Sequence, residues 1–371
     1  MKLALVHDYL IQDGGAEKVL TEFHHVFPEA PTYALLYDPE KVNPAYRSRV
    51  VRTSFLQKIP LALKKYQWLL PLMPMATETY DLAPFDVVLS SSSAFSKGVI
   101  TKPDALHICY CHTPTRYLWS DAVSYVQELR VPGIIKALLP PLLSRLRMWD
   151  KQAAERVDVF IANSEAVRRR IKKYYHRDAL VIYPPVDVAK FSLSSEPKNY
   201  FLAGGRLVSY KRYDLIIEAC NRLKLPLKIF GSGPVVEELK TMAGPTVEFL
   251  GRVSDEEKIK LYQNCIAFVN PQEEDFGITI IEAMAAGRPV IAYNRGGAIE
   301  TVIEGVNGTF FDSQDWETLA DTLMRFDQKK YHPELIRESV ERFSAENFRQ
   351  NIKQLVERAW EKQCLRCDLK K

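Results

Sequence analysis

Short apolar runs alternate with stretches of helical periodicity along the whole chain. The runs that are typical of buried strands lie at 2–6, 87–90, 107–111 and 159–162 in the first half, and at 200–203, 227–230, 247–250, 267–270 and 289–292 in the second. Strands buried on both faces of a sheet give continuous apolar runs, and their alternation with helices is typical of parallel sheets. The pattern therefore predicts an α/β protein with two doubly wound parallel-sheet domains.

Length and prolines indicate where these domains meet. The 371 residues exceed what one hydrophobic core usually serves. The consecutive prolines Pro184 and Pro185 oppose helix and favour an extended linker. We therefore expect one domain over 1–185 and a second over 186–344. The tail has helical spacing, which places these apolar residues on one face: Phe348, Ile352, Leu355, Val356 and Ala359.

Composition and charge narrow the class of protein. Hydrophobic residues make up 47% and charged residues 26%, as in ordinary soluble domains. The net charge of +4 is small for this length and argues against nucleic-acid binding as the main role. No apolar run reaches the ~18 residues that span a membrane. The opening MKLALVHDYL is interpreted as a buried strand and not as a leader.

The cysteines indicate a reducing, cytoplasmic setting. Four lie singly in apolar segments, as free core cysteines do: Cys109, Cys111, Cys220 and Cys265. Cys364 and Cys367 form one CxxC, without the second pair or the histidines that a zinc site needs. In a cytoplasmic protein the NGT triplet at 307–309 is expected to be a turn and not a glycosylation site.

The segment EEDFGITIIEAMAAGRPVIA, residues 273–292, carries the strongest chemical signal. Gly277 precedes a helical run, so a ligand can approach the first backbone N–H groups of the helix. These groups and the helix dipole favour an anion such as a diphosphate. Glu274 and Glu282 repel phosphate but bind hydroxyl groups, so we expect one at a sugar and the other at a ribose. The alternative is a polar loop followed by a surface helix with a solvated glutamate.

Two further motifs follow predicted strands. In GGRLVSYKR, Arg206 and Lys211 are five positions apart and could both turn toward one diphosphate. The chain contains no DxD arrangement for a divalent metal, which gives these cations added weight over a solvated basic turn. In HICYCHTPTRYLW, His112 opens a polar loop and could reach a sugar or the reacting centre, or only satisfy loop backbone. His107 is expected in the core.

The remaining motifs are weaker. Gly14 and Gly15 in QDGGAEK follow the first strand and could leave room for a phosphate or sugar, or only form a turn. Gly231 in GSGP could place backbone against a diphosphate or ribose. In GRVSDEEK, Val253, Asp255 and Lys258 could edge a base, and an aspartate would favour guanine over uracil. Ser254 and Glu257 also fit a capping box, so the acidic residues could simply start a helix.

The motifs GGAEK, CHTP, NSEAV with YPPVD, GGRLVSYKR, GSGP, GRVSDEE and EEDFGITIIEAMAAGRPVIA with GGAIE occur in this order over nearly the whole chain. This series resembles the retaining glycosyltransferases of family 4, which have the GT-B fold. The resemblance implies two Rossmann-like domains that face a cleft, with the acceptor mainly in the first and the donor in the second. It also implies a C-terminal helix, about 345–371, that crosses back to the first domain.

The resemblance also implies roles for single residues. Glu274 would contact the donor sugar and Glu282 the ribose, while backbone at Phe276, Gly277 and Ile278 would hold sugar hydroxyls and phosphate. Four further residues match family positions: Arg206 and Lys211 at the diphosphate, Gly15 near the reacting centre and His112 beside the donor sugar. Gly205, in GGRLVSYKR, is placed with the donor-binding residues.

Within the family, CHTPTRYLW and GRLVSYKRYDLIIEA look most like bacterial mannosyltransferases of polysaccharide and O-antigen assembly. GDP-mannose is therefore the expected donor, and a glycan or lipid-linked glycan the acceptor. The implied mechanism is front-face transfer with retention, in which the departing phosphate takes the acceptor proton. It requires no metal and no other cofactor, and Glu274 positions the sugar without acting as a base.

Three alternatives stay open. The first is a transferase of the same fold that uses a UDP-sugar, with glucose or N-acetylglucosamine. The second is a nucleotide-sugar 2-epimerase, which would need no acceptor. The third is a non-catalytic subunit that binds a nucleotide-sugar, although such a protein is expected to lose motif residues that this chain keeps.

The first half also has basic residues mixed with Trp and Leu. They are Lys64, Lys65, Trp68, Leu69 and Leu72, then Arg145, Arg147 and Trp149, and then Arg168, Arg169, Arg170, Lys172 and Lys173. Such a mixture suits an anionic membrane surface, where attraction amounts to ~1 kcal/mol per cation. It suits a solvated basic helix face equally well. A peripheral position at the inner face of a membrane would fit a lipid-linked acceptor.

Overall fold

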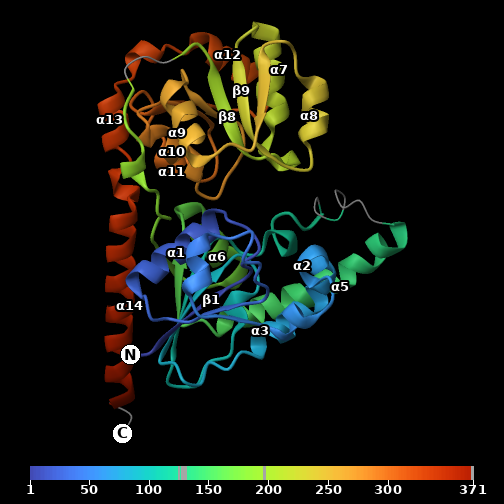
Figure 1. The fold of residues 1–371 in the computed structure, drawn as a ribbon, viewed down its shortest axis with the longest axis vertical. Helices are drawn as coiled ribbons and strands as arrows, with labels where there is room; N and C mark the ends of the chain where they lie inside the picture. Colours follow the sequence, from blue (N-terminus) through green and yellow to red (C-terminus); the bar gives the residue numbers. More distant parts are fainter. Residues whose placement is uncertain (124–125, 127–131, 195–197, 369–371) are drawn as a thin grey trace. The chain divides into compact units, whose positions relative to one another are not determined.

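The computed structural model describes residues 1–123, 126, 132–194 and 198–368. The chain forms two compact units, one of residues 1–183 with 348–371 and one of residues 184–347. Each unit is built on a parallel sheet that helices cover (Figure 1). The predicted fold class, α/β with two Rossmann-like parallel-sheet domains, is confirmed.

A seven-stranded parallel sheet forms the centre of the first unit, in the order β3-β2-β1-β4-β5-β6-β7. The strands are β1 Leu3–His7, β2 Thr32–Ala34, β3 Val51–Thr53, β4 Val87–Ser92, β5 Leu106–Cys111, β6 Val159–Ala162 and β7 Ala179–Val181. The chain order reverses between β1 and β4. The carboxyl ends of these two strands therefore flank a topological switch point, where open α/β sheets bind ligands.

The helices of the first unit are α1 Gly15–Val26, α2 Ala62–Lys65, α3 Met73–Glu78, α5 Gly133–Glu155, α6 Glu165–Tyr175 and α14 Ala345–Asp368. From Phe348 onward α14 belongs to this unit. Its side chains Phe348, Ile352 and Val356 are buried in one core with Phe23 of α1 and Tyr110 of β5. The apolar face predicted for the tail therefore packs as a helix face should.

The second unit is a six-stranded parallel sheet in the order β10-β9-β8-β11-β12-β13. Its strands are β8 Phe201–Arg206, β9 Leu227–Ser232, β10 Val247–Gly251, β11 Phe268–Asn270, β12 Val290–Tyr293 and β13 Gly308–Phe311. The switch point of this sheet lies between β8 and β11. Motifs that follow these two strands are thereby brought to one edge.

Helices cover both faces of the second sheet. They are α7 Tyr213–Leu223, α8 Val236–Met242, α9 Asp255–Asn264, α10 Ile278–Ala285, α11 Ala298–Thr301, α12 Trp316–Arg325 and α13 Pro333–Glu338. Figure 1 shows α7 and α8 on one side of β8 and β9, with α9, α10 and α11 on the other. Short 3-10 helices lie between the main elements: η1 Pro44–Ser48, η2 Phe55–Lys58, η3 Tyr66–Leu72, η4 Ser96–Gly98, η5 Arg116–Leu118, η6 Val188–Lys190, η7 Ser209–Lys211, η8 Gln328–Lys330 and η9 Glu341–Phe343.

Every strand predicted from an apolar run is present, with its ends shifted by a few residues. Sequence analysis did not identify β2, β3, β7 and β13, which have three or four residues each. Such short strands give no clear periodicity, and β3 and β7 are only partly buried. Their positions are set by the neighbouring strand, as in the pairing of Thr32 with Val51.

Several single-residue predictions are also confirmed. The four cysteines placed in apolar segments are buried and free, and Cys364 is a free thiol. The side chain of Cys367 lies outside the described part of the chain. Asn307 is fully buried, and its amide donates to Thr301 O and Ser339 Oγ while its Oδ1 accepts from Ile303 N. The NGT triplet is therefore an internal turn at the start of β13. Across the described residues, no helix is both long and apolar enough to cross a membrane.

Candidate functional site

The switch point of the second sheet holds an ion pair. Lys211 lies at the end of η7, after β8, and Glu274 lies in the loop after β11. Lys211 Nζ is 2.5 Å from Glu274 Oε1, and the two side chains are 13% and 15% exposed. Gln272 Nε2 donates to the same oxygen at 3.0 Å. Glu274 is therefore held from two sides at the edge where a ligand is expected.

Polar atoms without hydrogen-bond partners occur on the segments that carry this ion pair. Within the described part of the chain, Tyr213 Oη, Gln272 Oε1 and Thr279 Oγ1 are buried and make no hydrogen bond. A Cβ built on Gly205 would lie 3.4 Å from Tyr213 Oη and 3.6 Å from Lys211 Nζ, which places both groups beside this glycine. Buried polar groups are nearly always paired, so this cluster is suited to a polar ligand.

Helix α10 begins beside Glu274 and has an uncapped start. Its N-cap is Gly277, which has a φ of 88° and supplies no side-chain bond to the first turn. Residues other than glycine are strained at this φ. The first N–H groups of the helix therefore have no side-chain cap, and with the helix dipole they favour an anion. Phe276 is buried against Phe343 and fixes the loop before the helix.

The second carboxylate of the motif is buried, so the alternative of a solvated glutamate is wrong. The Glu282 side chain is 6% exposed and lies 3.1 Å from Lys258 Nζ. Tyr262 Oη donates to Glu282 Oε2 at 3.2 Å. Burial raises the pKa of Tyr262 well above its usual value, and the neighbouring carboxylate adds to this effect. Tyr262 therefore keeps its proton and remains a hydrogen-bond donor to Glu282.

The other residues predicted to bind the donor have different surroundings. Arg206 is exposed, and its guanidinium donates to Tyr210 Oη at 3.4 Å, whereas Lys211 is bound to Glu274. Gly231 could not carry a side chain, because a Cβ there would lie 1.8 Å from Gly205 O. The ends of β8 and β9 thus approach each other closely through backbone.

The capping box predicted before α9 is present. Ser254 Oγ accepts from Glu257 N, and Glu257 Oε2 accepts from Ser254 N. Asp255 begins the helix with a side chain that is 77% exposed, 3.5 Å from Lys258 Nζ. Its acidic side chain is therefore placed where it also favours the helix start.

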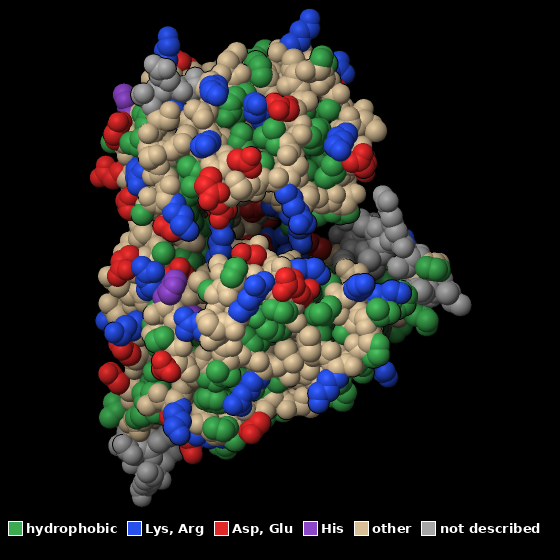
Figure 2. All heavy atoms as spheres, viewed as in Figure 1, with side chains coloured by type: hydrophobic (Ala, Val, Ile, Leu, Met, Phe, Trp, Pro, Cys, Tyr) green, Lys and Arg blue, Asp and Glu red, His purple; other side chains and the backbone are tan. Residues whose placement is uncertain are grey.

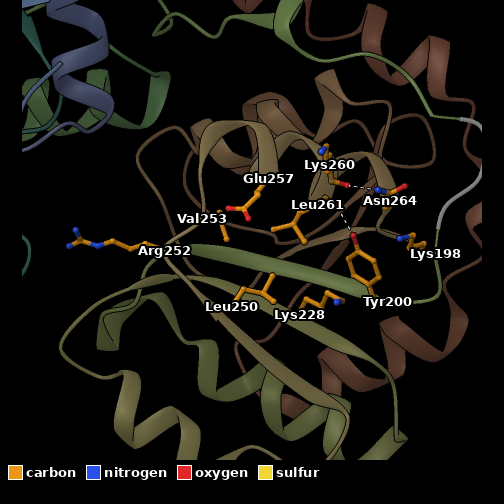
Figure 3. Close-up of a pocket in the computed structure, with 10 residues that line it drawn as sticks. All are labelled: Lys198, Tyr200, Lys228, Leu250, Arg252, Val253, Glu257, Lys260, Leu261 and Asn264. Carbon is orange, nitrogen blue, oxygen red and sulfur yellow. Dashed lines mark hydrogen bonds between the residues drawn. The ribbon is translucent and has the colours of Figure 1, made fainter. Parts of the chain in front are cut away.

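A cavity of about 420 Å³ lies along α9 (Figure 3). Of the predicted site residues it contains Val253, while neither Glu274 nor Lys211 is among the residues that line it. Basic side chains edge it, and Figure 3 shows Arg252 pointing away from the other labelled residues. The cavity therefore adjoins the predicted base-binding segment and does not contain the ion pair.

In the first unit, His112 follows β5 and is half-buried. Its Nε2 is 2.8 Å from Ser91 Oγ, at the end of β4. Burial lowers the pKa of His112 to about 4, and the charge of His7 contributes to this. The ring is therefore neutral at pH 7. Gly15 is the first residue of α1, directly after the loop that follows β1.

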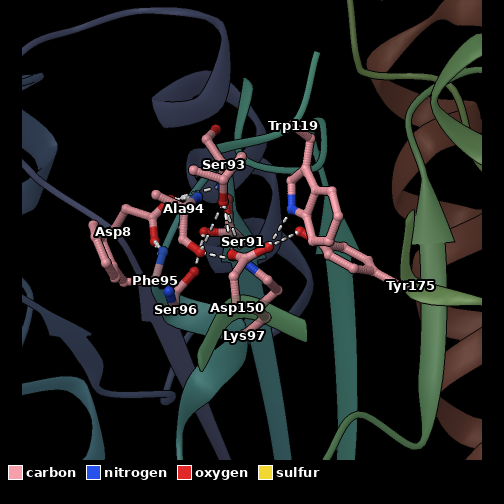
Figure 4. Close-up of polar contacts among 11 residues, drawn as sticks. Asp8, Ser91, Ser93, Ala94, Phe95, Ser96, Lys97, Trp119, Asp150 and Tyr175 are labelled. Atoms are coloured by element: carbon pink, nitrogen blue, oxygen red, sulfur yellow. Dashed lines mark hydrogen bonds and ion pairs between the residues drawn. The ribbon is translucent and has the colours of Figure 1, made fainter. Parts of the chain in front are cut away.

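The loop that His112 opens is fixed by a buried ion pair (Figure 4). Lys97 Nζ is 2.5 Å from Asp150 Oδ1, and both side chains are 1% exposed. The same carboxylate accepts from Thr115 Oγ1 at 2.8 Å and from Trp119 Nε1 at 2.7 Å. Burial alone would lower the pKa of Lys97, but Asp150 outweighs it and the pKa is raised. These contacts hold residues 112–119 without needing a ligand.

Within the described residues, no cluster of three His, Cys, Asp or Glu side chains could hold a metal ion. His107 is in the core as predicted: it is fully buried, and its Nε2 is 2.9 Å from Ser90 Oγ.

Comparison with known proteins connects both units to one kind of enzyme. Residues 13–190 match the Glycosyltransferase Family 4 model, and residues 187–353 match the model for Glycosyl transferases group 1. The chain belongs to the GT-B glycosyltransferases. Its two units correspond to the two family models, which meet near the Pro184–Pro185 segment.

Curated relatives of this glycosyltransferase include mannosyltransferases. The alpha-1,3/1,6-mannosyltransferase ALG2 of Dictyostelium discoideum is 25% identical over 62% of this chain and 63% of its own length. A GDP-mannose-dependent alpha-mannosyltransferase of Corynebacterium glutamicum is 38% identical over 31% of this chain and 28% of its own length. The chain thus matches less than two thirds of the length of each.

Solved structures show the same fold at low identity. Sucrose-phosphate synthase from Thermosynechococcus elongatus has a TM-score of 0.75 at 19% identity. The match covers 97% of this chain and 100% of the synthase chain. Anabaena Alr3699/HepE in complex with UDP and glucose has a TM-score of 0.71 at 20% identity, over 96% of this chain and 99% of its own.

Sequence analysis of this glycosyltransferase missed several residues at the two sites. Gln272, Tyr213 and Tyr262 contact or surround the two glutamates, and no motif pattern singled them out. His7 ends β1 and Ser91 is the last but one residue of β4, so a position near a strand end could have indicated them. Glu17, the glutamate of GGAEK, stands at the third helix position and accepts from Gly14 N, but a glycine at the N-cap gives no capping-box pattern that could have indicated it.

Proposed function

We propose that the protein transfers a hexose with retention, most simply mannose from GDP-mannose, to a glycan or a lipid-linked glycan. The observation that carries this proposal is the Lys211–Glu274 ion pair at the switch point of the second sheet. Among the described residues, Gln272 Oε1 and Tyr213 Oη on neighbouring segments are buried without partners, and helix α10 starts nearby without a side-chain bond from its N-cap. This combination suits a ligand with both hydroxyl groups and an anionic diphosphate.

The charged residues suit different parts of the donor. Lys211 and the start of α10 would attract the diphosphate, and Arg206 would add a second cation as the leaving group gains charge. When Lys211 turns to phosphate, Glu274 becomes available to sugar hydroxyls. Glu282 would hold the ribose, because Lys258 and Tyr262 keep its oxygens in place. In this scheme the leaving phosphate takes the acceptor proton, and neither a metal nor another cofactor is used.

The names of the curated relatives favour mannose. Both relatives described above are mannosyltransferases, and one is named as dependent on GDP-mannose. Asp255, exposed at the start of α9, adds a feature that guanine would satisfy and uracil would not. The competing donor is a UDP-sugar, since solved structures of similar fold contain UDP or UDP-glucose.

A thermal-shift panel distinguishes these donors without knowing the acceptor. GDP, GDP-mannose, UDP, UDP-glucose, UDP-N-acetylglucosamine and ADP are each added to the protein, because a ligand of the native state raises the unfolding temperature. We expect GDP compounds to stabilise and ADP to have little effect. Glu274→Gln should lose the extra shift that mannose adds to GDP, while Glu317→Gln, exposed on α12, should keep it. Stabilisation by UDP compounds alone would overturn the GDP-mannose proposal.

We also propose that the first unit docks on an anionic membrane surface from the cytoplasmic side. Exposed apolar side chains of η2, η3 and α3, and of the residue before α2, lie close in sequence to Lys64 and Lys65: they are Phe55, Leu61, Trp68, Leu72 and Met75. Figure 2 shows hydrophobic and basic side chains side by side over the region that carries α2, α3 and α5 in Figure 1. Trp68 is 63% exposed, which is unusual for a tryptophan unless another surface covers it.

The other residues considered for this surface differ in their contacts. Leu69 and Trp149 pack against the core beneath α2 and α5, and Trp149 Nε1 donates to Glu78. Arg147 donates to Leu118 O and lies over the Trp119 ring. Arg145 is exposed on α5, and α6 carries the exposed basic side chains Arg168, Arg169, Lys172 and Lys173. The proposed surface therefore rests on the α2 region.

A further inference from the structure

A continuous row of polar side chains runs from the interior of the first unit to His112. Glu17 Oε1 is 3.6 Å from His7 Nε2. His7 Nδ1 is 3.0 Å from Ser91 Oγ, and Ser91 Oγ is 2.8 Å from His112 Nε2. Glu17, His7 and Ser91 are buried, and only His112 is partly exposed. The row therefore ends at the side chain that the proposed function places beside the sugar.

Ser91 links the two histidines through a single hydrogen. Its hydroxyl can donate to one imidazole only, and no third partner of Oγ occurs among the described residues. If Ser91 donates to His7 Nδ1, then His112 must carry its proton on Nε2 to make its own bond to Oγ. If His7 donates from Nδ1, Ser91 donates to His112 Nε2, and the proton of a neutral His112 moves to Nδ1.

Glu17 determines which nitrogen of His7 carries the proton. Burial pushes the pKa of Glu17 upward, but the hydrogen bond and charge of His7, with the N–H of Gly14, outweigh it and the pKa is lowered. An ionised Glu17 keeps a proton on His7 Nε2, the nitrogen that faces it. A neutral His7 then has a bare Nδ1, and only a doubly protonated His7 can donate to Ser91.

We propose that Glu17, His7 and Ser91 are positioning residues that set which nitrogen of neutral His112 carries the proton. When His7 is neutral, His112 is protonated on Nε2 and presents Nδ1 as a hydrogen-bond acceptor. When His7 takes up a proton, the change passes through Ser91, and His112 presents Nδ1–H as a donor. No described residue bonds to His112 Nδ1, so this nitrogen is available to a substrate.

The backbone around Ser91 is held firmly enough for such a coupling. Asp8, next to His7, accepts four backbone N–H bonds from Ser93, Ala94, Phe95 and Ser96 at 2.6–2.8 Å (Figure 4). Ser96 Oγ in turn donates to Ser91 O at 2.8 Å. His112 N donates to Ser92 O, which fixes the other end of the row. The charged groups that face the two histidines are therefore Glu17 from α1 and Asp8 from the loop after β1.

The inference rests on the proposed function only for its use in catalysis. A sugar hydroxyl can donate to a bare Nδ1 or accept from Nδ1–H, so His7 would decide which contact the donor or acceptor finds. The coupling itself is a property of the protein without substrate. The two are therefore tested by separate measurements.

The direct test is the ¹⁵N NMR spectrum of the histidine side chains in the full chain, from about pH 5 to about pH 9. Nitrogen shifts distinguish the two neutral tautomers, and His7→Asn and His112→Asn spectra assign the signals. At high pH we expect His112 protonated on Nε2. His112 should be in the Nε2–H form wherever the His7 signals show a neutral ring, and in the Nδ1–H form wherever they show a doubly protonated one.

Variants separate this coupling from general structural effects. Ser91→Ala should abolish the tautomer change. The matched control is Ser92→Ala, because Ser92 Oγ is buried without a partner in the described structure and its loss should leave the change intact. Glu17→Gln keeps the space filled but removes the carboxylate that holds the proton on His7 Nε2, so a neutral His7 should no longer fix the tautomer of His112. An unchanged His112 tautomer across the range, or a change that survives in Ser91→Ala, overturns the proposal.

Activity provides the second measurement. Once a donor is identified, kcat of the wild type should change in step with the His112 tautomer, and Ser91→Ala should lose that dependence with a roughly tenfold lower kcat and little change in the donor KM. A tautomer change without any sugar transfer would contradict the proposed function and leave the coupling intact. Transfer without the tautomer change would do the reverse.

Discussion

At the proposed donor site, each of two glutamates is paired with a lysine. Glu274 is held between Lys211 and Gln272, and Glu282 between Lys258 and Tyr262. The two carboxylates that the proposed donor would contact are thus oriented, each beside a lysine, before any ligand arrives. Burying a carboxylate is unfavourable, and Lys211 and Lys258 offset this penalty. An anionic ligand would compete with the carboxylates for these lysines.

This balance predicts the effect of removing one partner. Lys211→Met should destabilise the second unit by up to about 3 kcal/mol, because it removes the lysine beside a carboxylate that has little contact with water. Glu274→Gln in the same chain should recover most of the loss. The measurement is urea unfolding of the three variants. Arg222→Met, which breaks an exposed pair with Glu218, is the control and should cost less than about 1 kcal/mol. An equal loss in both lysine and arginine variants would contradict the prediction.

The buried histidines of the first unit predict a pH dependence of stability. Burial lowers the pKa of His107 from 6.5 to about 3, and those of His24 and His112 to about 4. Below about pH 6.5 the unfolded chain therefore binds protons that the folded chain refuses, so the free energy of unfolding falls as pH falls from about 6.5 toward these values. Thermal unfolding at a series of pH values measures the slope.

The variant His107→Gln tests the largest of these shifts. Gln can still bond to Ser90 but does not titrate, so the slope below about pH 6.5 should become shallower. His332→Gln, at an exposed position before α13, should leave the slope unchanged. A slope that is the same in both variants would show that His107 does not contribute.

What the sequence revealed about single residues depended on whether their neighbours are local. The EEDFG segment predicted Glu274 and the helix start after it, because both lie within a few positions. The sequence did not show that Lys211 would bind Glu274, since 63 positions separate them. Nor did it place Ser91 between two histidines, because a serine at a strand end is common and its partners come from other strands.

The place of helix α14 in the first unit depends on contacts with residues that are far from it in the sequence. Its sequence is polar on average, and its position in the first unit comes from one apolar stripe that meets α1 and β5. Phe348 stacks on Phe23 at 5.8 Å between ring centroids. Arg349 adds an ion pair of 3.0 Å to Glu22, which is a minor contribution at the surface.

Truncation of this stripe should unfold the first unit more easily. Ile352 is fully buried, so Ile352→Ala should lower the free energy of unfolding by about 2–5 kcal/mol. Lys353→Ala, the exposed neighbour on the same helix, should change it by less than about 0.5 kcal/mol. Denaturant unfolding followed by circular dichroism measures both. A small loss for Ile352→Ala would mean that α14 is only loosely attached.

Elements with a strong pattern were predictable, and those without one were not. The strands buried on both faces and the long tail helix follow directly from apolar spacing. The strands β2, β3, β7 and β13 have three or four residues and depend on a neighbour for their register. Physical context outside the element therefore determines them, and a single sequence does not carry it.

At the scale of the whole molecule, the proposed membrane surface can be separated from net charge. Lys64→Glu with Lys65→Glu reverses two charges beside Trp68. Binding to vesicles of phosphatidylserine and phosphatidylcholine at low salt should weaken at least about tenfold, because each cation contributes ~1 kcal/mol near such a surface. The assay is vesicle co-sedimentation.

A charge-matched variant provides the control for this binding. Lys240→Glu with Arg325→Glu alters two exposed cations of the second unit by the same amount and should leave vesicle binding unchanged. Trp68→Ser should weaken binding without any change in charge. Equal weakening in both charge-reversed variants would show that the attraction is unspecific, and failure of the wild type to bind would remove the membrane proposal.

The buried turn at Asn307 also affects how the protein ages. An asparagine followed by glycine is the pair most prone to deamidation, because the backbone nitrogen of the glycine can attack the side-chain amide when the chain is mobile. Here the amide is tied to Thr301 and Ser339, and Gly308 is packed so closely against Val290 O that a Cβ would lie 2.3 Å from it. The glycine nitrogen therefore cannot reach the side-chain amide in the folded protein. We expect Asn307 to stay intact when the native protein is stored. Conversion of Asn307 to aspartate would indicate that β13 has opened.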